Sequence, residues 1–373
     1  MHKLTFFPLG NADCIRLELA NGRQLLFDYA AMRDDSDEDD LRIDLPATLR
    51  ADLRTAKRTD YDVVAFTHLD DDHVKGAGDF FWLDHAEKYQ GKDRIKIREL
   101  WVPAAAVTEE GAEDDARVIR QEARHRLKAG KGIRVFSRPE RLKDWLEAQK
   151  PSLTVDSRRA LITDAGQIVP GFALANDGVE FFVHSPFAVR QNEKEVEDRN
   201  EDALVLHASF LVDKVTTKAL LTSDIAHGGI SDIVQITRKK KREERLEWDI
   251  LDVPHHCSYT ALSDDKGKDV TEPVPDVKWL YEKKGQNGCI VVSGSKVIPD
   301  DDKDPQPPHR QAANYYKQCA ERHGGEFKVT MEHPDKSAPK PLVIEIDGTG
   351  GRILKKIAGG VASVLGTPAP RAG

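Results

Sequence analysis

The sequence predicts a mixed α/β fold, of the α+β type, in which two mixed sheets pack face to face and are covered by helices. Apolar, strand-like runs occur in both halves of the chain, and helix-like segments follow each group. With 373 residues, 39% hydrophobic and 32% charged, the chain can bury a large core. We find no repeat and no linker. We therefore expect one domain over residues 1–357 with a helical insertion near 108–150, and a disordered Gly/Ala/Pro-rich tail over 358–373.

The first half of the chain begins with strands and turns. The predicted strands are Leu4–Phe7, Cys14–Leu19, Gln24–Asp28, Val63–Thr67 and Arg98–Val102. Asn21-Gly22 is a strong hairpin signal between the second and third of these strands. The highly charged segment Asp34–Asp44 is expected to be an exposed loop, and a helix is expected to begin near His73. Amphipathic periodicity predicts two helices in the insertion, Glu113–Lys128 and Pro139–Gln149.

The second half returns to strands. These are predicted at Val179–His184, Ala203–Phe210, Thr217–Thr222, Asp249–Val253 and Cys289–Val292. The last helix is expected at about His309–His323. Two closing strands are expected at Pro341–Ile346 and Arg352–Ile357.

Composition excludes several classes of protein. No apolar run is long enough to span a bilayer, and residues 1–8 are typical of a first strand rather than a signal peptide, so we expect a cytoplasmic protein that does not bind membranes. The four cysteines are scattered, without a CxxC pair, which argues against a disulfide or zinc framework. The net charge of −8 argues against broad binding of long nucleic acid. The local basic run Arg238–Arg242 is either a solvated helix end or a grip for phosphates.

The strongest functional signal is the segment Thr67–His73, which follows a buried apolar strand. Two imidazoles and up to three carboxylates leave that strand within one short loop. These carboxylates repel one another at close range, and a divalent cation removes the repulsion. Histidine with aspartate is a ligand set suited to zinc or manganese, so the segment predicts a metal site, whereas the alternative is a solvated acidic turn.

Two further strand ends carry metal-binding side chains. Asp224 follows an apolar strand, so its carboxylate can reach the same edge of the sheet; its alternative role is a helix N-cap. His255 and His256 follow another strand. Adjacent side chains point in different directions, so we expect one of them to bind metal. We favour His255 as the ligand, with His256 orienting or contacting substrate.

The order of these motifs resembles the metallo-β-lactamase superfamily, whose usual loop is His-x-His-x-Asp-His. Here the loop reads His-x-Asp-x-Asp-His, and this variant resembles the hydrolase domain of ComEC-type DNA-uptake proteins. The supporting segments lie between about residues 3 and 320. They are Leu9–Cys14 (the Gly-Gln-Gly-Asp-Ala turn), Leu26–Asp28, Leu220–Asp224 (Leu-Leu-Thr-Gly-Asp) and Val253–Ser258 (His-His-Gly-Ser). The resemblance implies a four-layer αβ/βα sandwich.

The resemblance also implies a binuclear centre that holds two divalent metal ions, zinc or manganese. The implied ligands are His68, Asp70, Asp72, His73, Asp224 and His255. Asp224 would bridge the two ions. The residues expected to act in catalysis are Asp72, His256 and His309. The ions would lower the pKa of bound water from about 15.7 toward roughly 7, and the resulting hydroxide would attack the substrate.

Other positions refine this expectation. Asn200 stands where the superfamily usually has a histidine; together with Asp70 it makes the site rich in oxygen, which favours manganese or magnesium. His184 could substitute, although a structural role is favoured. Asp28 is expected to hold a ligand histidine in one tautomer, or else to cap a turn. His309 and Arg310 open a helix and could contact phosphate or donate a proton; the alternative is an ordinary helix start.

The sequence therefore predicts a metal-dependent hydrolase of phosphodiester bonds, a nuclease or phosphodiesterase. Its expected partners are a nucleic acid or nucleotide substrate and a protein encoded nearby. One alternative is a hydrolase of a small amide, lactone or thioester. Another is an effector or partner-binding protein with a vestigial site, against which the intact ligand set argues.

Overall fold

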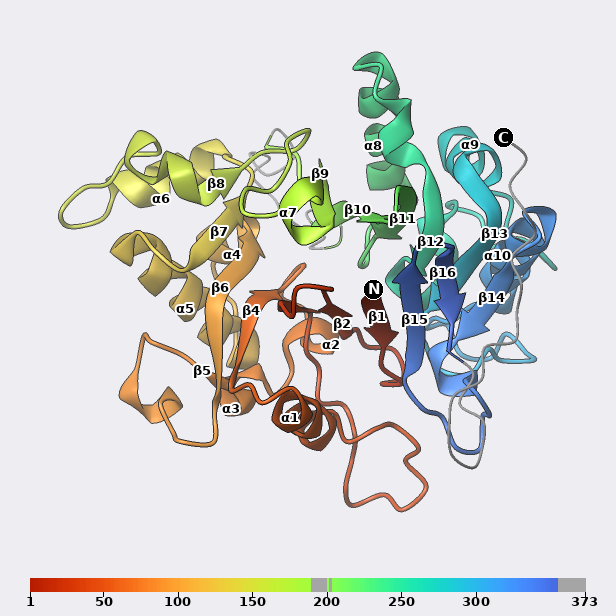
Figure 1. The fold of residues 1–373 in the computed structure, drawn as a ribbon, viewed down its shortest axis with the longest axis horizontal. Coiled ribbons are helices and arrows are strands. Elements are labelled where there is room, and N and C mark those ends of the chain that lie inside the picture. The colour runs from red at the N-terminus through yellow and green to blue at the C-terminus, as the bar shows by residue number, and fades with distance from the viewer. Residues whose placement is uncertain (189–199, 201–202, 355–373) are drawn as a thin grey trace.

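The computed structural model describes residues 1–188, 200 and 203–354, and it contains two sheets that pack face to face (Figure 1). The predicted fold class is confirmed. The larger sheet has the strand order β16-β15-β1-β2-β3-β4-β6-β7-β8, with β5 paired to β6. The smaller sheet has the order β14-β13-β12-β11-β10-β9. The predicted tail over 358–373 lies outside the described residues.

The larger sheet combines an antiparallel part and a parallel part. Its strands are β1 (His2–Phe6), β2 (Ile15–Glu18), β3 (Gln24–Phe27), β4 (Asp60–Ala65), β5 (Phe81–Trp82), β6 (Ile95–Pro103), β7 (Ile133–Phe136), β8 (Ile162–Thr163), β15 (Leu342–Asp347) and β16 (Gly350–Ile353). Strands β3, β4, β6, β7 and β8 run parallel. The carboxyl ends of these parallel strands therefore meet at one edge of the sheet.

The smaller sheet repeats this arrangement. Its strands are β9 (Val179–Ser185), β10 (Val205–Val212), β11 (Val215–Leu221), β12 (Trp248–Val253), β13 (Gly285–Ser293) and β14 (Glu326–Val329). Strands β11 to β14 run parallel. The sequence places polar side chains immediately after β11 and β12, so these residues gather at one edge of this sheet as well.

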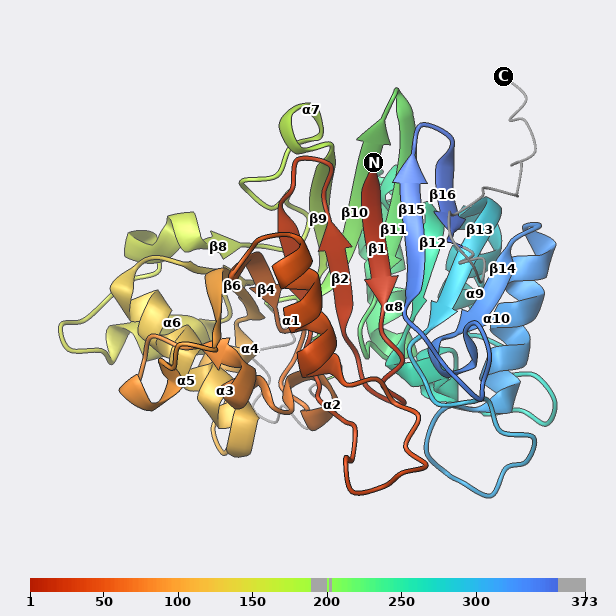
Figure 2. The ribbon, with the colours of Figure 1, turned by 60° about the horizontal axis from the view of Figure 1, so that its bottom comes forward.

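Helices cover the outer face of each sheet, which gives four layers (Figure 2). Those of the larger sheet are α1 (Leu45–Thr55), α2 (Asp71–Val74), α3 (Ala77–Phe80), α4 (Ala105–Thr108), α5 (Asp114–Ala129) and α6 (Glu140–Glu147). Those of the smaller sheet are α8 (His227–Lys239), α9 (Pro275–Lys284) and α10 (Arg310–Arg322); the short α7 (Leu174–Asp177) precedes β9. Each helical layer packs its apolar stripe on its sheet, and a third core lies between the sheets.

Aromatic side chains fill the core between the sheets. Trp101 of β6 is fully buried, and its ring meets those of Phe27, Phe136, Phe172 and Phe181 at centroid distances of 5.5–6.5 Å in edge-to-face geometry. Such pairs contribute about 0.5–1.5 kcal/mol beyond the area they bury. This packing holds the two sheets in one relative position, which is what fixes the strand ends that carry the site.

The predicted hairpin at Asn21-Gly22 is confirmed: β2 and β3 pair antiparallel, and Gly22 has φ 83°. The predicted helical insertion over 108–150 is wrong in one respect. It contains β7, which pairs parallel with β6, so this segment extends the sheet. Among the described residues, no helix combines the length and apolar character needed to cross a membrane.

Candidate metal centre

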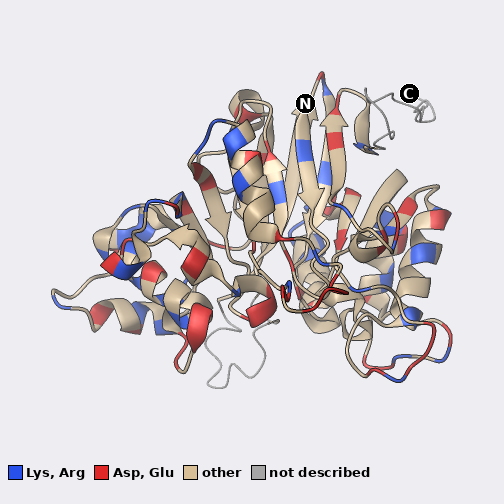
Figure 3. Ribbon diagram, turned by 90° about the horizontal axis from the view of Figure 1, so that it is seen from below, with Lys and Arg blue, Asp and Glu red and all other residues tan. Residues whose placement is uncertain are grey.

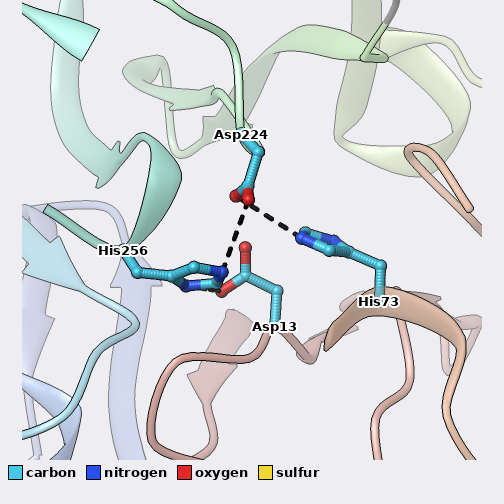
Figure 4. A group of neighbouring side chains, drawn as sticks. All are labelled: Asp13, His73, Asp224 and His256. Carbon is cyan, nitrogen blue, oxygen red and sulfur yellow. Dashed lines mark ion pairs between the residues drawn. The ribbon is translucent and has the colours of Figure 1, made fainter. Parts of the chain in front are cut away.

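Side chains from both sheets converge at the strand ends into two overlapping groups, the first of which is drawn in Figure 4. One group consists of Asp13, His73, Asp224 and His256, and the other of His68, Asp72 and His73. Within each group the ligand atoms lie within 4.8 Å of one another. The groups share His73, so they adjoin one another.

The short helix α2 sets the first strand end. Asp70 precedes it in extended conformation, and its carbonyl accepts hydrogen bonds from the backbone N–H groups of His73 and Val74. This turn buries the ring of His73 completely and leaves the Asp72 carboxylate 29% exposed. Asp72 and His73 are consecutive residues, but their side chains differ in exposure because one helical step rotates them by about 100° relative to each other.

A strained turn sets the histidine pair after β12. His255, His256 and Cys257 have φ values of 51°, 50° and 67°, in the left-handed region. Non-glycine residues held in this region each cost on the order of 1–3 kcal/mol and cluster at functional sites. The backbone N–H of His255 donates to the carbonyl of Ser223 at 3.1 Å, which joins this turn to the loop that carries Asp224.

Asp224 lies between two imidazoles. Its Oδ1 is 3.4 Å from Nε2 of His73, and its Oδ2 is 3.4 Å from Nε2 of His256 (Figure 4). Nε2 of His256 is also 3.1 Å from Oδ2 of Asp72. The rings of His68 and His73 have centroids 3.8 Å apart.

Three polar atoms of the centre are buried without a hydrogen bond of good geometry: Nε2 of His68, Nε2 of His73 and Oδ1 of Asp224, the last two of which face one another at 3.4 Å. Buried polar atoms nearly always have a partner, because an unmade hydrogen bond costs about 1–3 kcal/mol. Two imidazole nitrogens and a carboxylate oxygen are together the donor set of a divalent transition metal. The residues present therefore fit a metal ion.

Acceptors behind the rings select the imidazole tautomers. Oδ2 of Asp28 lies 2.9 Å from Nδ1 of His73, while the same carboxylate accepts from the backbone N–H and hydroxyl of Thr67. The carbonyl of Gly294 lies 2.8 Å from Nδ1 of His256. A carbonyl can only accept, so Nδ1 carries a proton, and Nε2, which faces Asp72 and Asp224, is the nitrogen that a cation would bind in place of a proton. The expected positioning role of Asp28 matches this contact.

The charges within the centre shift its titration. Burial alone lowers the pKa of His256, but the carboxylates of Asp224 and Asp13 raise it to about 10. Burial alone raises the pKa of Asp72, but the hydrogen bond with His256 and the charge of His73 lower it to about 2. Burial raises the pKa of Asp13 to about 7. A divalent cation competes with the imidazole protons, so its binding weakens as the pH falls.

A small, mostly apolar cavity with room for about one water molecule lies beside the centre. Its polar lining is Asp13, Asp28, Thr67, Ser223 and Asp252. Asp252 ends β12, is 3% exposed, and has its pKa raised well above the usual range by burial. Asp28, which follows β3 of the larger sheet, and Asp252, in β12 of the smaller sheet, therefore line the same cavity.

The structure brings together four of the six predicted ligands: His68, Asp72, His73 and Asp224. Asp70 lies outside both groups; its Oδ2 is 3.5 Å from Nε2 of His68, and its side chain is 38% exposed. For the adjacent pair after β12, the prediction favoured His255 as the metal ligand. His256, not His255, belongs to a group, because the left-handed turn points its ring inward.

His255 lies at the rim of the centre. Its Nδ1 is 3.4 Å from Oγ1 of Thr260, and its ring centroid is 6.4 Å from that of His256. His309 is held nearby: its backbone N–H donates to the carbonyl of Cys257 at 3.1 Å, and its ring packs on Tyr259 with a centroid distance of 4.8 Å.

Two other predicted residues, Arg310 and Asn200, lie outside both groups. Arg310 pairs with Asp302 at 2.8 Å and donates to the carbonyl of Lys268. The backbone carbonyl of Asn200 accepts from the N–H of Ala203 at 3.3 Å, and the next residue, Leu204, donates to the carbonyl of Thr67 at 2.9 Å.

The alternative ligand His184 is buried, with Nε2 2.9 Å from the carbonyl of Arg245, which supports the structural role favoured for it.

Sequence reasoning did not identify Asp13 as a possible ligand. Its signal was present in the segment Leu9–Cys14, which resembles a family turn that contains an aspartate. The backbone N–H of Asp13 donates to the carbonyl of Asp72 at 3.0 Å, so this turn is joined directly to helix α2.

No protein-family model matches this sequence, and no curated protein does. Among solved structures, the chain is similar to a new diphosphatase from the PhnP family, with 11% identity and a TM-score of 0.36 over 93% of this chain and 98% of that one. It is also similar to the metallo-β-lactamase SMB-1 bound to 2-mercaptoethanesulfonate, with 13% identity and a TM-score of 0.28 over 67% of this chain and 79% of that one. The fold and the centre define the class of this chain as a four-layer α/β sandwich with clustered histidines and aspartates at its strand ends.

Proposed function

We propose that this protein is a metal-dependent hydrolase of the metallo-β-lactamase superfamily that cleaves phosphodiester bonds. The observation that carries the metal requirement is the convergence of buried imidazole and carboxylate atoms within 4.8 Å of one another, among which atoms of His68, His73 and Asp224 lack a well-formed hydrogen bond. Natural proteins rarely bury such atoms side by side without a ligand to satisfy them. The phosphodiester preference is supported by the Asp70 and Asn200 replacements, which resemble the ComEC-type pattern.

The two overlapping groups support a centre for two ions. They offer three imidazoles and three carboxylates, from His68, His73, His256, Asp13, Asp72 and Asp224. Imidazole suits zinc, while carboxylate oxygens suit manganese, so a mixed set accepts both. Divalent cations held here would activate a water molecule and stabilise the charge that develops in an in-line displacement.

The chain's own residues have distinct parts in this reaction. Asp28 and Gly294 hold the rings of His73 and His256 in the tautomer that presents Nε2. Asp72 is the partly exposed carboxylate of the centre, and we assign to it the orientation of the attacking water. We assign to His255, at the rim, the donation of a proton to the leaving oxygen.

An activity screen tests this proposal. Purified protein is incubated with bis-p-nitrophenyl phosphate, plasmid DNA, short RNA and nitrocefin, each with manganese or zinc. We expect turnover of the phosphodiesters, and no turnover of nitrocefin. Asp224→Ala should lower the activity by at least about 100-fold, because it removes the carboxylate between the two imidazoles. The matched control is Asp71→Ala, an exposed carboxylate of the same helix as Asp72.

The other outcomes separate the alternatives. Turnover of nitrocefin without turnover of any phosphodiester would replace the substrate class with that of a small amide or ester. A fully metal-loaded protein that is inactive on every substrate would favour the binding or effector role. Equal losses in Asp71→Ala and Asp224→Ala would show that the effect is one of folding.

A further inference from the structure

We infer that Asp13 is a metal ligand and that Gly294 is the positioning residue that admits it to the centre. The inference rests on the proposed metal binding and adds a residue pair from two loops. One loop follows β1 and carries Asp13, and the other follows β13 and begins with Gly294.

The position of Asp13 supports the first half of this inference. Its carboxylate points between His73 and His256 and faces Asp224 (Figure 4). Its Oδ1 is 3.8 Å from Nδ1 of His256. The other three residues of the group are buried, so an acidic side chain directed among them has few neighbours other than imidazoles and carboxylates. A cation in this group would satisfy Asp13 and Oδ1 of Asp224 together.

Gly294 contacts two members of the group at once. Its carbonyl accepts from Nδ1 of His256 at 2.8 Å. A Cβ atom added at Gly294 would lie 2.6 Å from Oδ1 of Asp13, which is closer than real Cβ atoms approach an oxygen. A side chain at this position would therefore push the Asp13 carboxylate away from its position.

Neither loop can move aside easily, because Asn11 ties them together. Its Oδ1 accepts from the backbone N–H of Lys296 at 3.0 Å, and its Nδ2 donates to the carbonyl of Pro307. On the other side, the hydroxyls of Ser293 and Ser295 are 2.8 Å apart. A methyl group at Gly294 would thus lie between the end of β13 and Asp13. We expect the Asp13 carboxylate to move, because the backbone of both loops is held by these bonds.

The two positions of the centre should respond differently to a change at Asp13. This residue belongs to the group of His73, Asp224 and His256, and it is absent from the group of His68 and Asp72. Loss of the Asp13 carboxylate should therefore weaken one position and spare the other. For Gly294 the expected scale is that of a residue that orients a ligand, whose loss typically costs about 10–100-fold in metal affinity.

Metal titration tests the inference without an activity assay. The binding of Mn²⁺ and Zn²⁺ is measured by isothermal calorimetry and elemental analysis for the full chain and for Asp13→Ala, Gly294→Ala and the double variant. We expect each single variant to retain about one tight ion in place of about two, or to bind the second at least 10-fold more weakly. Gly91→Ala is the control, because its added Cβ meets nothing closer than 3.8 Å.

The double variant separates the two residues. If Gly294 acts through Asp13, Gly294→Ala adds no further loss of affinity to Asp13→Ala. Full binding of both ions by Asp13→Ala would overturn the role of Asp13. Full binding by Gly294→Ala, with loss in Asp13→Ala, would overturn the role of Gly294. A parent protein that binds no divalent ion would overturn the proposed function itself, which is a different result from either of these.

Discussion

At the scale of single residues, the adjacent histidines after β12 show how backbone conformation assigns different tasks to identical side chains. His255 and His256 both have φ near 50°, yet only the ring of His256 enters a metal-binding group. Its Nδ1 donates to a carbonyl within the protein, whereas His255 contacts a hydroxyl at the rim. The left-handed turn therefore converts neighbours in sequence into one inward and one outward imidazole.

This difference predicts the effect of replacing each histidine. His256→Ala should lower metal affinity at least about 10-fold, because it removes a ring with Nε2 near both Asp72 and Asp224. His255→Ala should retain the metal content of the parent and lose turnover instead. Elemental analysis after gel filtration gives the first quantity, and steady-state kinetics gives the second. Metal loss in His255→Ala with normal content in His256→Ala would reverse the assignment.

Local sequence predicts much of this site, whereas the remainder depends on backbone conformation and tertiary packing. The segment that contains His68, Asp72 and His73 is recognisable because acidic and imidazole side chains follow an apolar strand. The choice between His255 and His256 depends on backbone dihedral angles, which residue types alone do not determine. Asp13 and Gly294 approach one another only through tertiary packing, so no spacing in the sequence indicates their contact.

At the scale of elements, the strand ends concentrate the chemistry and the periodicity of the sequence predicts most of the strands. The strands that were not predicted are the two-residue β5 and β8, β14 (Glu326–Val329), and β7 (Ile133–Phe136), a four-residue run between two strongly amphipathic helices. Its strand conformation comes from parallel pairing with β6, which is a tertiary contact. Helix α1 was also not predicted, although Asp44 caps it by accepting from the backbone N–H of Ala47 at 2.9 Å.

Strands β9 and β10 carry a second histidine pair that bears on stability rather than on the site. His184 and His207 are buried, with ring centroids 6.1 Å apart, and Nε2 of each lies 2.9 Å from a backbone carbonyl of the segment that precedes β12. Burial lowers the pKa of His184 to about 4 and that of His207 to about 3. Both rings are therefore neutral in the folded protein.

The neutral pair predicts a loss of stability in acid. In the unfolded chain these histidines titrate near 6.5, so below that pH the unfolded state binds more protons than the folded state. Their contribution is fully present above about pH 6.5 and falls by up to about 1.4 kcal/mol per histidine for each pH unit down toward 4. Denaturant unfolding at pH 7.0 and 5.0, with chelator present to remove the effect of metal release, measures this loss. His184→Gln/His207→Gln should show a flatter pH dependence, and an unchanged slope would contradict the assignment.

At the scale of the whole molecule, charge is distributed without a single basic face. Figure 3 shows acidic and basic residues interspersed over both lobes, in keeping with the net charge of −8. The basic run Arg238–Arg242 lies at the end of α8, whose 13 residues separate it from the start of the helix beside Asp224 by about 20 Å. Lys239, Lys240 and Lys241 are exposed there, while Arg238 packs over Trp279. A small substrate at the centre cannot reach this run, but a polymer can.

This geometry makes the basic run a test of substrate length. If the substrate is a long nucleic acid that follows α8, Lys239→Glu/Lys241→Glu should raise its KM several-fold and leave kcat unchanged, because the change affects binding far from the reacting bond. Turnover of bis-p-nitrophenyl phosphate should stay the same. The control is Lys128→Glu/Lys131→Glu at the exposed end of α5, which changes the net charge by the same amount. An equal rise in KM for both double variants would indicate only general repulsion of a polyanion. No rise in either would show that the basic run is a solvated helix end and that the natural substrate is small.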